Sequence, residues 1–159
     1  MPHTHDPDPQ GGGAGRRRAG LVRPPRPLDA RLKEAVCDAV FRYQLQQPLA
    51  DAPRPLGYYG ARQGREPDDA CLGRLRAFVS DVQPLSHCRV SARDGVVDRI
   101  SGACGVIVQV TRLTWVHAAA ADVVGGYDLT PWHAACFRGH VEHDGRYWAV
   151  TAAQLLWRV

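Results

Sequence analysis

The sequence is poor in lysine, in paired cysteine motifs and in long apolar runs. Lys33 is the only lysine among 20 basic residues, so arginine carries the positive charge. The five cysteines are odd in number and include no Cys-x-x-Cys spacing, which argues against a zinc ribbon and a complete disulfide framework. No stretch approaches the roughly 18 apolar residues of a membrane-spanning helix, and no signal peptide is expected. These absences favour a reduced, cytoplasmic protein.

Familiar catalytic and nucleotide-binding motifs are also missing. No Gly-x-Ser-x-Gly nucleophile elbow occurs. The glycine-rich stretch GGGAGRRR at residues 11–18 lacks the Gly-Lys-Ser/Thr ending that a phosphate-cradling loop requires. The sequence therefore predicts no cofactor, no metal ligand and no identifiable catalytic residue.

Charge and composition divide the chain into two unequal parts. Residues 1–27 carry five arginines and two aspartates among many prolines and glycines, whereas residues 28–159 carry 15 basic and 14 acidic residues. A low-complexity segment buries too little apolar surface to offset its ordering entropy. We therefore expect a disordered basic tail over 1–27 and a single domain over 28–159. Because the basic charge belongs to the tail, nucleic acid is an unlikely partner.

Two amphipathic helices are predicted in the first half of this domain. Residues 28–47 begin with a good N-cap, Asp29, and continue with apolar residues at helical spacing. These are Leu32, Val36, Val40 and Tyr43. A second helix is predicted over 67–79, opened by Pro67 or Asp68. Its apolar stripe consists of Leu72, Leu75, Phe78 and Val79. The segment between the helices is predicted to be a loop with one short extended piece at residues 58–59.

Beyond Pro84 the pattern becomes that of β-strands. A short strand is possible at 87–92, and longer strands are predicted at 105–116, 121–129, 133–142 and 146–159. Gly125-Gly126 suggests a bulge or a close backbone approach, and Asp144-Gly145 indicates a hairpin turn. The predicted fold is α+β, with N-terminal helices packed on a curved antiparallel β-meander of about four or more strands.

The second half of the chain resembles a group of uncharacterised small bacterial proteins. The resemblance lies in the runs GVVDRISGACGVIVQVTRLTWV, ADVVGGY, DGRYWAV and LLWRV. Over residues 29–159, the order of a long helix followed by a meander also resembles the NTF2-like and cystatin-like folds. This resemblance implies a pocket between helix and sheet, in which NTF2-like enzymes place a Tyr, Asp or His. Other NTF2-like members are binding or dimerisation modules.

Residues 133–143, HAACFRGHVEH, concentrate histidines, a cysteine and a glutamate. Strand alternation places Cys136, His140 and Glu142 on one face and His133 on the other. Cys136 and His140 would be about 13 Å apart along a strand, too far to share a metal ion without other elements. The preferred interpretation is the polar outer face of a hairpin. A general-base pair formed by His140 and Glu142 is the alternative.

Aromatic residues of the β half define the candidate pocket. It comprises Tyr58, Tyr59, Trp115, Tyr127, Asp128, Trp132, His133 and Trp148. Such side chains can fill a helix–sheet core or line a ligand pocket, and both interpretations stay open. The leading hypothesis is a binding or interaction module with an unknown small-molecule or protein partner. Homodimerisation through the free sheet face is possible. The alternative is a small NTF2-like enzyme with isomerase-like or dehydratase-like acid–base chemistry.

Overall fold

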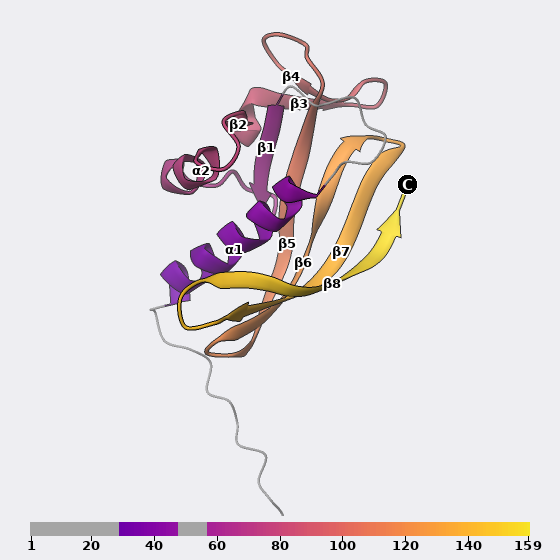
Figure 1. The fold of residues 1–159 in the computed structure, drawn as a ribbon. Helices are drawn as coiled ribbons and strands as arrows, with labels where there is room; N and C mark the ends of the chain where they lie inside the picture. Colours follow the sequence, from indigo (N-terminus) through magenta and orange to yellow (C-terminus); the bar gives the residue numbers. More distant parts are fainter. Residues whose placement is uncertain (1–28, 48–56) are drawn as a thin grey trace, which may run out of the picture.

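The computed structural model describes residues 29–47 and 57–159, so the predicted tail lies outside the described residues. It shows an α+β protein dominated by a mostly antiparallel sheet (Figure 1). The helical elements are α1 (Asp29–Gln46), α2 (Asp69–Arg76) and a short 3-10 helix η1 (Leu85–His87). The strands are β1 (Gly57–Arg62), β2 (Val82–Gln83), β3 (Cys88–Ser91), β4 (Gly95–Asp98), β5 (Gly105–His117), β6 (Ala120–Thr130), β7 (His133–His143) and β8 (Trp148–Arg158).

The main sheet has six strands in the order β2-β1-β5-β6-β7-β8. Strands β5 to β8 form the predicted antiparallel meander. Strand β1 pairs in parallel with β5 and with β2, which the sequence did not predict. The short extended piece expected at residues 58–59 is therefore part of a longer strand inside the sheet.

Helix α1 lies across one face of this sheet, as predicted (Figure 1). Val36, Val40 and Phe41 are completely buried and pack against apolar side chains of β5 to β8. The helical spacing of these residues places them on one face of α1, and burying that face stabilises the helix. Neither described helix is long and apolar enough to cross a membrane.

Helix α2 is shorter than the sequence predicted. It begins after Asp68, whose carboxylate accepts a hydrogen bond from the backbone N–H of Cys71 at 2.8 Å, and it ends at Arg76. Leu72 and Leu75 are buried as expected. Phe78 was wrongly assigned to the buried stripe, because the chain leaves the helix before reaching it and its ring stays exposed.

The hairpin formed by β3 and β4 covers part of the opposite sheet face, over β1 and β5. Its residues Cys88 and Val96 pack with Tyr59 and Ile107 in a second apolar cluster. The start of β5 is thus buried on both faces, which explains its unbroken apolar run. Gly95 has a φ of +76°, and a Cβ there would lie 2.3 Å from the carbonyl oxygen of Leu129.

The predicted close backbone approach at Gly125-Gly126 is confirmed. A Cβ on Gly125 would lie 2.6 Å from the Gln109 carbonyl oxygen and 2.7 Å from Nε2 of Gln44. That amide donates a hydrogen bond of 2.8 Å to the Gln109 carbonyl. The missing side chain at Gly125 therefore allows α1 to reach the sheet backbone.

Candidate functional site

The structure distributes the predicted pocket residues over several parts of the sheet. Tyr58 packs beneath the helices, whereas Tyr59 is buried under the β3–β4 hairpin and donates a hydrogen bond to Asp98. Trp115 and Trp148 form an edge-to-face pair with ring centres 5.7 Å apart. Trp132 is 81% exposed at the turn between β6 and β7. These five residues do not share one cavity.

The remaining three predicted residues lie near the end of β6 but on opposite faces of the sheet. Tyr127 and His133 are neighbours on the α1 side, with ring centres 6.1 Å apart. Asp128 faces the other side and accepts a hydrogen bond of 2.7 Å from Gln109 Nε2. Burial raises the pKa of Asp128. Because the sheet separates Asp128 from His133, the two cannot act together on one small substrate.

The histidine-rich strand β7 presents a polar outer face. Nδ1 of His140 lies 2.7 Å from Asp122 Oδ1 of β6, and its Nε2 lies 3.6 Å from Glu142 Oε1. The sequence paired His140 with Glu142 and missed Asp122, its nearer partner. Within 29–47 and 57–159, no group of three or more His, Cys, Asp or Glu residues could hold a metal ion.

A groove lies between α1 and the start of β8. Its volume is about 230 Å³. Helix α1 contributes Arg42 and Tyr43, the segment after α2 contributes Phe78, and the β7–β8 hairpin contributes Tyr147 and Trp148. Of the eight predicted pocket residues, only Trp148 lines this groove. The groove thus lies between helix and sheet, as the predicted pocket would, but most of the residues that line it are not the predicted ones.

Arg42 and Phe78 separate this groove from a second depression. The guanidinium carbon of Arg42 lies 5.1 Å from the centre of the Phe78 ring, a cation–π contact. The second depression has a volume of about 310 Å³ and is lined by these two residues with Asp38, Arg74 and others. Both depressions share the Arg42–Phe78 pair, so movement of this pair would join them.

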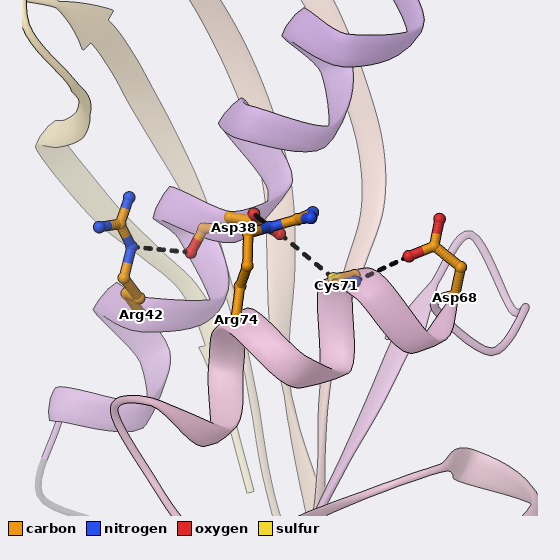
Figure 2. Close-up of polar contacts among 5 residues, drawn as sticks. All are labelled: Asp38, Arg42, Asp68, Cys71 and Arg74. Atoms are coloured by element: carbon orange, nitrogen blue, oxygen red, sulfur yellow. Dashed lines mark hydrogen bonds and ion pairs between the residues drawn. The ribbon is translucent and has the colours of Figure 1, made fainter.

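The buried carboxylate of Asp38 lines the second depression, and Figure 2 shows its polar contacts. Asp38 of α1 forms an ion pair with Nε of Arg74 and accepts a hydrogen bond from the Cys71 thiol at 3.2 Å. Burial and the Asp38 carboxylate raise the pKa of Cys71 to about 12. The hydrogen bond that Arg74 donates to Asp38 raises the pKa of Arg74. The cluster therefore holds α2 against α1 with one negative and one positive charge paired.

Arg42 extends from the same cluster with a different role. Its Nε donates to the Asp38 backbone carbonyl at 3.3 Å, which orients the guanidinium toward Phe78. Its two terminal nitrogens make no hydrogen bond to any other described residue. Asp38 is paired with Arg74, and among the described residues Arg42 forms no ion pair, so it places a positive charge where the two depressions meet. The groove can therefore accept an anionic group beside aromatic walls.

Sequence reasoning missed most of these residues for identifiable reasons. Arg42 lies outside the apolar stripe predicted for residues 28–47, and Phe78 was assigned to the core by its helical spacing. Tyr147 follows the Asp144-Gly145 turn and was treated as the start of a strand. The sequence did contain one indication of this groove: Phe78 and Tyr147 are aromatic residues beside the ends of predicted elements, where side chains often stay partly exposed.

Comparison of the chain with protein-family models, with curated proteins and with solved structures found no match. The resemblance to NTF2-like and cystatin-like folds therefore stays a prediction. Function has to be inferred from the geometry of this chain.

Proposed function

We propose that this protein is a binding module for a small anionic ligand with a flat apolar part. The ligand would lie in the groove between α1, the segment after α2 and the start of β8. The observation that carries the proposal is the Arg42 guanidinium stacked on Phe78 between two adjoining depressions.

The walls of the groove suit a planar apolar group. Tyr43, Phe78, Tyr147 and Trp148 contribute four aromatic rings from three separate parts of the chain. Phe78 and Tyr147 are each about half exposed, so a ligand that covers them removes apolar surface from water. Ligand sites of proteins typically enclose about 300–1,000 Å³, and the two adjoining depressions together fall in that range.

The charge of the groove favours a carboxylate or phosphate. Arg42 is the charged residue in the lining of the groove, and in the adjoining depression Arg42 and Arg74 contribute two positive charges against the single carboxylate of Asp38. The planar guanidinium can donate two parallel hydrogen bonds to an oxyanion while its face remains on an aromatic ring. Arg42 would therefore position the anionic end and the aromatic walls the apolar end.

The same groove supports the proposed NTF2-like character of the fold. In that group the ligand pocket lies between a long helix and a meander, which is where α1 and β8 enclose this groove. The agreement is in the position of the groove between helix and sheet.

Binding can be tested with matched ligand pairs on the full chain. We expect 2-naphthoate to quench tryptophan fluorescence through Trp148 and to bind more tightly than neutral 2-naphthamide. Arg42→Gln should weaken naphthoate binding by about 10-fold or more, since a hydrogen bond to a charged group contributes roughly 1.5–3 kcal/mol. Isothermal titration calorimetry measures both affinities.

The matched control is Arg112→Gln, which removes an exposed arginine on β5 away from the groove. It should leave naphthoate affinity unchanged. Equal affinities for the acid and the amide, or equal loss in the two arginine variants, would contradict an anion site at Arg42.

A further inference from the structure

We propose that two copies of this chain associate through the free edge of β8, pairing antiparallel so that one sheet runs through both copies. This proposal concerns a different surface from the ligand groove and does not depend on it. It replaces the expected contact through a sheet face with a contact through a sheet edge.

Strand β8 ends the six-stranded order, so within 29–47 and 57–159 only one of its long edges is paired. Every residue from Thr151 to Val159 is exposed. Pairing with β7 continues to the end of this stretch, where Ala134 and Val159 exchange two backbone hydrogen bonds of 3.2 and 3.0 Å. Register shifts at Thr151 and Leu156 interrupt the strand, and the stretch from Ala152 to Leu155 between them offers a regular row of backbone donors and acceptors.

This edge carries two bulges but lacks the charges and prolines that most directly prevent strand addition. The ten residues from 148 to 157, WAVTAAQLLW, include no charge, no proline and no glycine. Exposed edge strands are normally shortened or carry charges or prolines that block pairing. The opposite edge of the same sheet follows that rule, because β2 is only two residues long. Because the β2 edge is too short to pair in the same way, association through β8 would stop at a dimer.

Apolar side chains cluster along the same edge. Leu155 is 60% exposed and Trp157 is 50% exposed, and Leu156 and Val159 are also exposed. The exposed Trp132 lies at the same end of the sheet, two residues from the Ala134 that pairs with Val159. Four exposed apolar residues within the last five positions of the sequence exceed scattered exposure and favour an interaction site.

The segments outside the described ranges are rich in proline, a residue that disfavours strand pairing. Residues 1–28 and 48–56 fall outside the described ranges and hold nine of the chain's 12 prolines. Proline removes the backbone donor that strand pairing needs. Neither segment therefore has the composition of a seventh strand.

A second copy of β8 meets the requirements that these segments fail. An uncharged strand can lie beside its own copy without repulsion between like charges. In an antiparallel two-fold pair, the single Arg158 of each copy would lie at opposite ends of the interface. Each copy then covers the apolar residues of the other, and α1 and its groove stay accessible.

The mass of the full chain in solution tests the proposal. Light scattering after size exclusion should give twice 17.4 kDa at micromolar concentration. The double variant Leu155→Lys/Trp157→Lys should raise the dimer dissociation constant by about 30-fold or more, because it removes two central apolar contacts and adds like charges. Sedimentation equilibrium measures that constant.

The matched control is Val90→Lys/Ile100→Lys, which makes the same chemical change at two exposed apolar positions away from β8. This variant should remain a dimer. Gln154→Lys provides a milder edge variant if the double variant fails to fold, and it should also weaken the dimer. A single-chain mass for the wild type, or a dimer unaffected by a folded β8 variant, would overturn the proposal.

Discussion

Strand β8 has two halves in different surroundings. Trp148, Ala149 and Val150 lie against α1 and are at least half covered, and Trp148 is 7% exposed. From Thr151 onward every residue is exposed. In Figure 1 the first part of β8 passes beside α1, while the last part extends beyond the helix. One strand thus takes part in both the core and the free surface.

The difference shows how far one helix can protect a sheet. An 18-residue helix is roughly 27 Å long and 10 Å wide, and strands of 11–13 residues reach about 36–43 Å. Helix α1 therefore covers only the part of each long strand that it crosses. Strand β5 is covered at its start and exposed in its second half. The proposed groove lies where this cover ends, and the proposed dimer edge lies beyond it.

The largest expected effect comes from comparing the two tryptophans of β8, one in the half covered by α1 and one in the exposed half. Trp148→Ala should lower the free energy of unfolding by about 3–5 kcal/mol, because it opens a cavity beneath α1 and removes the partner of Trp115. Trp157→Ala should cost less than about 1 kcal/mol in a chain diluted until it is monomeric. Urea denaturation followed by circular dichroism measures both, and comparable losses would refute the division.

Removing the charge of a buried carboxylate should lower the free energy of unfolding more than removing that of an exposed one. The difference should be smaller than the one between the two tryptophans. Asp38→Asn should destabilise the protein by about 1–3 kcal/mol, because Arg74 and the Cys71 thiol lose a charged acceptor. Asp69→Asn is the control, since Asp69 is exposed in the first turn of α2 and should cost at most about 0.5 kcal/mol. Equal urea midpoints for the two variants would contradict a structural role for Asp38.

The sequence predicted the elements that follow a clear period. Helix α1 and strands β5 to β8 were expected close to their observed bounds, because each has a long apolar pattern. Strand β1 was expected only in part, since the parallel pairing that extends it depends on β5, distant in sequence. Strand β4 was missed because turn signals surround it on both sides.

The site was harder to predict than the fold. Asp122 and His140 are separated by 18 residues, and their pairing depends on a register shift between Asp128 and Thr130. A regular hairpin around Pro131-Trp132 would place Asp122 opposite Val141. A one-residue bulge therefore creates the contact, and periodicity alone does not locate such a bulge.

The Asp122–His140 contact gives the smallest expected effect. The hydrogen bond that His140 donates to Asp122, followed by the charges of Asp122 and Glu142, raises the pKa of His140 above its ordinary value. A raised pKa stabilises the folded state fully below about pH 6.5, and that contribution is lost as pH rises through the folded-state value. Asp122→Asn should therefore destabilise the protein more at pH 5 than at pH 9. Urea midpoints at the two pH values measure this difference.

Glu142, the second carboxylate beside His140, provides the control for Asp122. Because Asp122 lies 2.7 Å from the ring and Glu142 lies 3.6 Å from it, Asp122→Asn should lower the pKa of His140 more than Glu142→Gln does. Both residues are exposed on the uncovered face, so water screens their charges and the loss of stability should stay small. NMR titration of the His140 ring protons gives the pKa in each variant. A larger change in Glu142→Gln would show that the ring turns toward Glu142 in solution.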